Sequence, residues 1–168
     1  YLRRYWAYER RIDRALRLRL ASVEDAAADL PQRLNRLFDQ PAPDGVIDWQ
    51  KLACPLATRG AFSILPCGPG TGKPTTLVRL LPLLPAPAVD SGSPLRIRLA
   101  APTGKAAARL TESISQQVLS LTVPDNVREK IPTQVTTVHR LLGSRPGTRH
   151  FRHHPGNPLP LDVLVVDE

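Results

Sequence analysis

Cys67-Gly68-Pro69-Gly70-Thr71-Gly72-Lys73 is the stretch of the chain that indicates the fold most directly. It lies between an apolar segment, residues 61–65, that we expect to form a buried strand, and a leucine-rich segment with helical spacing. Glycines let consecutive backbone N–H groups turn towards a phosphate, and the start of the following helix favours its negative charge. The stretch therefore predicts a phosphate-binding loop, with Gly68, Pro69, Gly70, Thr71, Gly72 and Lys73 around a nucleotide.

The loop departs from the usual pattern, G-x-x-x-x-G-K-[ST], at two positions. Cys67 stands at the first glycine, and Pro74 stands where a hydroxyl would bind Mg²⁺. Pro74 also lacks the backbone N–H that should face a phosphate, and Thr75 supplies a hydroxyl one position late. We count Pro74 and Thr75 among the nucleotide-binding residues and expect weak ATP binding with negligible turnover.

Asp167-Glu168 directly follows an apolar stretch, residues 161–166, in which we expect a strand, 163–166, buried on both faces. In this position an aspartate binds Mg²⁺ or its water, and a glutamate can polarise the attacking water. Asp167 lies 94 residues after Lys73, with a predicted strand between them, and this spacing favours a nucleotide-binding domain. Together the two motifs predict a P-loop NTPase in which Lys73, Asp167 and Glu168 are catalytic. Asp167 is the residue expected to bind the Mg²⁺ that accompanies the nucleotide.

Strand and helix patterns alternate through this part of the chain. A predicted strand, 95–100, precedes an alanine-rich helix, 105–119, and residues 143–160 are predicted to form a loop or hairpin. This alternation predicts an α/β fold, a partial RecA-like domain with a parallel sheet. After Lys73 the leucines keep helical spacing to Leu84, although Pro82 and Pro85 would stand inside that helix.

The first forty residues have a different pattern. Apolar side chains recur every three or four residues from Tyr5 to Leu20, with arginines between them, which predicts an amphipathic helix. Pro31 is expected to open a further short helix, and a short helix is predicted at 49–53. The Pro- and Gly-rich break at 41–45 predicts a small all-α domain, 1–43, before the α/β domain, 44–168.

The composition excludes several classes of protein. A net charge of +8 indicates an anionic partner, and residues 1–20 contain seven arginines against two acidic residues. Only two cysteines are present and they form no CxxC pair, so we expect a reducing, cytoplasmic location. The most apolar stretch, 80–89, is short and contains three prolines, so no membrane association is expected.

Further motifs indicate which kind of NTPase this is. Residues 101–110, Ala-Pro-Thr-Gly-Lys-Ala-Ala-Ala-Arg-Leu, strongly resemble helicase motif Ia, and residues 137–143 resemble the next DNA-facing motif. Gln50 lies where superfamily 1 helicases carry an adenine-reading glutamine. Over essentially its whole length, including 157–168, the chain resembles the RecD-type helicases, the alpha subunits of exodeoxyribonuclease V.

The resemblance implies an ATP- and Mg²⁺-dependent DNA helicase subunit that acts on single-stranded DNA in recombinational double-strand break repair. It also implies RecB- and RecC-like partner subunits, which the N-terminal helices would contact, and a nuclease site on a partner. Helicase motifs III to VI are absent from the chain, so we do not expect it to translocate by itself.

The residues expected at DNA are Thr103, Gly104, Lys105, His139 and Arg140. Thr103 and the first N–H groups of the following helix can hold a DNA phosphate, although Thr103 can equally serve as an ordinary helix cap. His139 can touch DNA or pack at a helix start, and by itself the sequence favours packing.

Two alternative functions remain at this point. Cys67 and Pro74 are compatible with a structural subunit whose nucleotide binding is impaired. The motifs also fit the helicase domain of another superfamily 1 protein, such as a conjugative relaxase.

Overall fold

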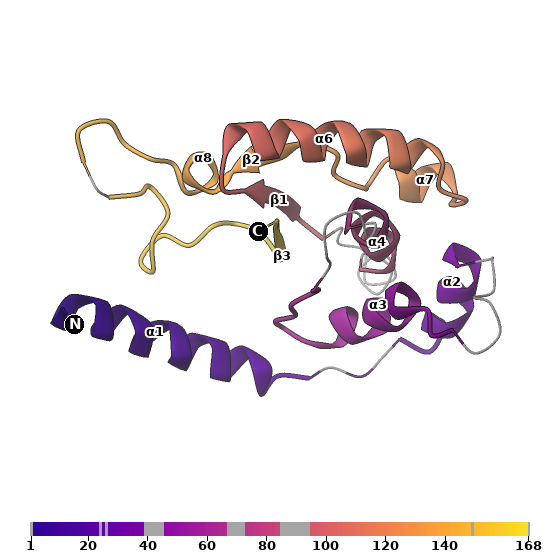
Figure 1. The fold of residues 1–168 in the computed structure, drawn as a ribbon, viewed down its shortest axis with the longest axis horizontal. Coiled ribbons are helices and arrows are strands. Elements are labelled where there is room, and N and C mark those ends of the chain that lie inside the picture. The colour runs from indigo at the N-terminus through magenta and orange to yellow at the C-terminus, as the bar shows by residue number, and fades with distance from the viewer. Residues whose placement is uncertain are drawn as a thin grey trace. The chain divides into compact units, whose positions relative to one another are not determined.

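The computed structural model describes residues 2–23, 25, 27–38, 46–66, 73–84, 95–148 and 150–167. The chain forms two compact units, Tyr1–Thr71 and Gly72–Glu168 (Figure 1). The domain boundary expected between residues 43 and 44 lies outside the described residues.

The first unit contains three described helices: α1 (Arg3–Leu20), α2 (Leu30–Leu37) and α3 (Trp49–Arg59). The amphipathic helix α1 has the predicted extent, but it buries none of its residues. Pro31 lies in the first turn of α2, as predicted, where its missing N–H leaves no helical bond unmade. Helix α2 packs against α3 and buries Leu37, while Cys54 of α3 is completely buried.

Helix α3 is longer than the predicted 49–53 because it continues through Pro55 to Arg59. Asp48 caps its start, since the Asp48 carboxylate accepts a hydrogen bond from the Lys51 backbone N–H at 3.0 Å. Packing against α2 offsets the helical hydrogen bond that Pro55 cannot donate.

The buried strand predicted at 61–65 is wrong in this structure. These residues form no strand, and Ile64 is 74% exposed. The first of these residues and the one before it pair elsewhere: Gly60 forms an isolated antiparallel bridge with Val23, and the Ala61 backbone N–H donates to the Ser22 carbonyl. A strand needs a neighbour for its backbone groups, and no described strand pairs with residues 61–65.

The second unit contains a three-stranded parallel sheet, which confirms the predicted α/β class. The strands are β1 (Ile97–Ala101), β2 (Val135–Thr137) and β3 (Val163–Val166), in the order β2-β1-β3. The register pairs Leu99 with both Val135 and Val165. The three strands therefore run side by side with β1 in the middle.

Helix α6 (Gly104–Leu119) packs along one face of this sheet (Figure 1). It buries residues at helical spacing, and α4 (Lys73–Leu80) packs beside it. The resulting core consists of Leu77, Val78, Leu81, Ile97, Leu99, Leu110, Ile114, Val118 and Ile131. The remaining described elements of this unit are two short helices, α7 (Asp125–Arg128) and α8 (Val138–Leu142), and one 3-10 helix, η1 (Leu81–Leu83).

Two expectations for this unit need correction. Helix α4 ends at Leu80, and Pro82 lies in the first turn of the 3-10 helix η1 (Leu81–Leu83), where no donor is required of it. Strand β3 is not buried on both faces, because Leu164 and Val166 are exposed while Val163 and Val165 pack on the core. The strand lies at the edge of the described sheet, and the helices that pack on it cover one face.

Candidate functional site

The three parallel strands end together at one edge of the sheet. Ala101 of β1 pairs with Thr137 of β2, and Ala100 pairs with Val166 of β3. Asp167 extends this pairing, since its backbone N–H donates to the Ala100 carbonyl at 3.0 Å. In open α/β sheets, ligands bind outside the carboxyl ends of the strands. We call this border of the sheet the carboxyl edge.

Asp167 is the acidic residue of the carboxyl edge. It follows β3 directly and is partly buried, and its carboxylate forms no hydrogen bond or ion pair with the residues that the structure describes. Its oxygens therefore remain available to a ligand. Glu168 lies outside the described residues.

Thr103 connects β1 to α6 and caps the helix. Its hydroxyl oxygen accepts a hydrogen bond from the Ala106 backbone N–H at 3.2 Å, which satisfies one of the free donors of the first turn. Gly104 and Lys105 follow in that turn, and both are exposed. The cap leaves the remaining N–H groups of the helix start and the Lys105 side chain open to an anion.

A second threonine cap, not foreseen from the sequence, lies at the end of β2. Thr137 accepts a hydrogen bond from the Arg140 backbone N–H at 3.2 Å and so opens α8, on which His139 and Arg140 lie. The His139 ring packs against Phe151, with 5.9 Å between ring centres. His139 thus has a packing contact, and Arg140 is exposed.

The loop after α8 folds back as the predicted hairpin. Gly143 ends the helix with φ 71°, and the Arg152 N–H donates to its carbonyl at 2.8 Å. A Cβ at residue 143 would lie only 2.8 Å from the Arg152 Cβ, so both the backbone angle and the close approach require glycine.

Thr111 connects α6 to β2, and this role was not predicted from the sequence. It lies in the middle of α6, where its hydroxyl donates to the Ala107 carbonyl at 2.8 Å and accepts from the Val135 N–H at 3.0 Å. The first residue of β2 is thereby fixed to the helix that Thr103 opens. No sequence signal distinguishes this threonine from an ordinary helix residue.

Lys73 is the first residue of α4, and Pro74 and Thr75 follow in its first turn, all three partly buried. The loop residues before it, Gly68, Pro69, Gly70, Thr71 and Gly72, lie outside the described residues. Gln50 is the second residue of α3 in the first unit.

The opposite end of β3 is held by an ion pair. Asp162 accepts from the Arg96 backbone N–H at 2.8 Å and from the Arg96 guanidinium at 3.1 and 2.9 Å. The Asp162 N–H donates back to the Arg96 carbonyl at 3.0 Å. The hydrogen bonds from Arg96 lower the pKa of Asp162 to about 2. This Arg96–Asp162 clamp fixes the register of β3, and with it the position of Asp167.

Among the described residues, no helix is long and apolar enough to cross a membrane.

Comparison with known proteins identifies the class first. The family model described as an AAA domain matches residues 50–168, which is most of the chain. The chain therefore belongs to this family of nucleotide-binding domains. The match begins at Gln50 and runs to the acidic pair, so it includes α3 from its second residue and the whole second unit.

Curated relatives narrow the identification to the RecD type. The chain is 43% identical to the RecBCD enzyme subunit RecD of Mycolicibacterium smegmatis and 44% identical to that of Mycobacterium tuberculosis strain H37Rv. Both alignments cover 100% of the chain but only 29% and 28% of the relative. The ATP-dependent RecD2 DNA helicase of Deinococcus radiodurans is 32% identical over 90% of the chain and 20% of its own length. The resemblance to RecD-type helicases is confirmed, and the chain spans less than a third of these relatives.

Proposed function

We propose that this chain supplies the ATP-binding and DNA-contacting part of a RecD-type helicase subunit. The observation that carries the proposal is the carboxyl edge, where β1, β2 and β3 deliver Thr103, Arg140 and Asp167 to one side of the sheet. Asp167, the capped start of α6 and the cations Lys105 and Arg140 all follow strands at this edge. This combination suits a site that binds both a nucleotide and the phosphate backbone of a nucleic acid.

The nucleotide-binding role is proposed for the loop before α4. From the sequence motifs we assign Lys73 to the outer phosphates, residues 68–72 with Pro74 and Thr75 to the rest of the nucleotide, and Gln50 to the adenine. Asp167 suits Mg²⁺, because its carboxylate accepts nothing from the described residues and Mg²⁺ is commonly held by one carboxylate, phosphates and water. Mg²⁺ would supply charge neutralisation at the phosphates, and Glu168 would orient the attacking water.

The DNA side uses Thr103, Gly104, Lys105, His139 and Arg140. Thr103 and the first N–H groups of α6 hold one phosphate, and Lys105 and Arg140 add positive charge beside it. These are backbone contacts, so binding of single-stranded DNA should be nearly independent of base sequence and should weaken steeply with salt.

The parent protein is proposed to unwind DNA within a RecBCD-type complex that repairs double-strand breaks, in the cytoplasm. The domain boundary at residues 43 and 44 belongs to the same proposal. Residues 1–43 would then form the part that contacts RecB- and RecC-like subunits, and α1 supports this because its apolar side chains are unburied.

The test is a pair of titrations on the whole 168-residue chain. A fluorescent ATP analogue with Mg²⁺ should bind weakly, and Lys73→Ala should abolish that binding. Single-stranded oligonucleotides of different sequence should bind alike, and Lys105→Ala with Arg140→Ala should weaken them. If the chain binds DNA but no nucleotide, with or without Mg²⁺, the alternative of a structural subunit is correct.

A further inference from the structure

Helix α1 carries a cluster of arginines that the proposed function does not use. Arg14 lies at its centre, with Arg10 four residues before it, Arg11 three before it and Arg17 three after it. Residues three or four apart are neighbours on a helix surface. We call these four residues the arginine cluster.

Little in the described structure neutralises the cluster. Asp13 pairs with Arg17 at 2.8 Å, and this pair is exposed. Arg10, Arg11 and Arg14 form no ion pair with any described residue. Like charges at this spacing repel one another and destabilise a helix, so an anion bound among them would relieve that repulsion.

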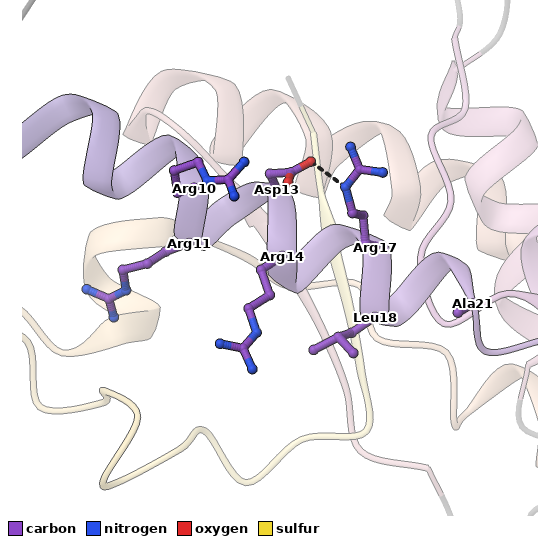
Figure 2. A pocket seen from close by; sticks show the side chains of 7 residues that line it. All are labelled: Arg10, Arg11, Asp13, Arg14, Arg17, Leu18 and Ala21. Carbon is purple, nitrogen blue, oxygen red and sulfur yellow. Dashed lines mark hydrogen bonds and ion pairs between the residues drawn. The ribbon is translucent and has the colours of Figure 1, made fainter.

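The four arginines line a surface pocket together with Asp13, Leu18 and Ala21. Figure 2 shows Arg11 and Arg14 extending to one side of α1, while Arg10, Arg17 and Asp13 lie towards the other. Arg11 and Arg14 are thus the two neighbouring guanidinium groups that point the same way without an acidic partner between them.

The centre of the cluster, Arg14, lies away from the apolar stripe of the same helix. That stripe consists of Tyr5, Tyr8, Ile12, Leu16 and Leu20, and Ile12 precedes Arg14 by two positions, which places the two side chains on opposite sides. A protein partner that covers the apolar stripe would leave Arg14, at the centre of the cluster, in solvent.

We propose that the arginine cluster binds the phosphodiester backbone of a nucleic acid, at a site separate from the carboxyl edge. Guanidinium groups match phosphate oxygens two at a time, and residues 1–20 contain seven arginines but no lysine. This proposal does not depend on the function proposed for the carboxyl edge.

The strong exposure of the cluster favours a nucleic acid over an acidic protein. Exposed ion pairs between proteins contribute little, because water and salt screen them. A nucleic acid instead carries condensed counterions, and their release favours binding even where the charges remain in solvent. The Arg17 side chain is 77% exposed, so the cluster lies in solvent, where counterion release still favours binding to a nucleic acid.

The experiment compares two double variants of the whole chain that remove the same charge from the same helix. Arg11→Gln with Arg14→Gln removes the centre of the cluster, and Arg4→Gln with Arg19→Gln removes two arginines outside it. Single-stranded DNA is titrated over a series of salt concentrations, and circular dichroism verifies that α1 is retained in each variant.

The cluster variant should reduce the slope of log affinity against log salt by about 1.4, from two lost contacts at about 0.7 each. The Arg4 and Arg19 variant should leave that slope unchanged. Equal losses in both variants, or no loss in either, would overturn the proposal. So would binding of poly-glutamate that is as strong as DNA binding and is equally lost in the cluster variant.

A third variant, Lys105→Ala with Arg140→Ala, separates this proposal from the proposed function. If the two sites are independent, its effect on the salt slope adds to that of the cluster variant. Loss in the cluster variant alone supports the arginine cluster and contradicts the carboxyl-edge contact, and loss in the third variant alone does the reverse.

Discussion

Strand β3 has an aspartate at each end, and the two have very different surroundings. Asp162, just before the strand, accepts three hydrogen bonds from Arg96, and its pKa is lowered to about 2. Asp167, just after the strand, uses only its backbone N–H, and its carboxylate accepts nothing from the described residues. One carboxylate holds two strands in register, and the other is the one for which we propose a ligand.

The two ends of the sheet therefore differ in whether their polar groups are paired within the fold. The amino ends of β1 and β3 are joined by a satisfied ion pair, whereas the Asp167 carboxylate and the Lys105 and Arg140 side chains at the carboxyl edge pair with none of the residues that the structure describes. A ligand site needs polar groups that the fold itself has not used. The clamp at the other end keeps those groups in place.

The largest expected effect comes from removing the two carboxylates in turn. Asp167→Asn should weaken ATP binding in the presence of Mg²⁺ by about a hundredfold, roughly two charge-assisted contacts, and leave the melting temperature nearly unchanged. Asp162→Asn should lower the melting temperature and leave ATP affinity within about twofold. Nucleotide titration and thermal denaturation of both variants provide the measurement, and identical profiles would show that the two ends do not differ in role.

Pro74→Thr provides a second test of the difference between Asp162 and Asp167. It restores the hydroxyl that the phosphate-binding loop lacks at this position. A charge-assisted contact contributes about 1.5–3 kcal/mol, so ATP affinity with Mg²⁺ should rise by about tenfold or more. The gain should disappear when Asp167→Asn is added, since both groups would act on the same ion, and should persist with Asp162→Asn. A gain that is unchanged in the absence of Mg²⁺ would contradict this assignment.

Thr103 tests whether a residue of the carboxyl edge serves the fold and a ligand together. Thr103→Ala removes the cap of α6 and should lower the free energy of unfolding by about 1 kcal/mol. It should also weaken the binding of single-stranded DNA, and Thr103→Ser, which keeps the hydroxyl, should restore both. Urea denaturation and DNA titration of both variants provide the measurement. If DNA affinity is the same in Thr103→Ala as in the unaltered chain, Thr103 serves only as a helix cap.

The sequence predicted those parts of the fold that local pattern determines. Strand β3 and helix α6 were located almost to the residue, because an apolar run and a threonine cap with helical spacing are local signals. Residues 61–65 have an equally apolar pattern, but a strand also depends on which neighbour pairs with it, and Gly60 pairs with Val23 instead. Strand β2 has only three residues and offers no periodicity to detect.

The residues of the candidate site divide in the same way between local signals and roles that depend on the fold. Asp167 and Thr103 belong to motifs that can be recognised from their immediate neighbours. Thr111 and the Arg96–Asp162 clamp act on partners 24 and 66 residues away, so their roles follow only from the fold. The sequence placed His139 at a helix start, and the cap formed by Thr137 could have been expected from a threonine just before that helix.

The smallest expected effect is the acid response of the Arg96–Asp162 clamp. The Arg96 and Asp162 side chains are 61% and 35% exposed, so solvent and salt screen the pair. Its contribution to the stability of the fold is therefore modest. In the unfolded chain the carboxyl of Asp162 takes up a proton near its ordinary pKa of 3.8, whereas in the folded chain it does so only at about 2. The stabilisation is therefore fully present above about pH 4 and is lost as the pH falls from there towards 2. Melting temperatures measured between pH 6 and pH 2 should fall less steeply in this window for Asp162→Asn, and likewise for Arg96→Gln, than for the unaltered chain. If all three proteins lose stability in parallel below pH 4, the clamp does not contribute to the acid sensitivity of the fold.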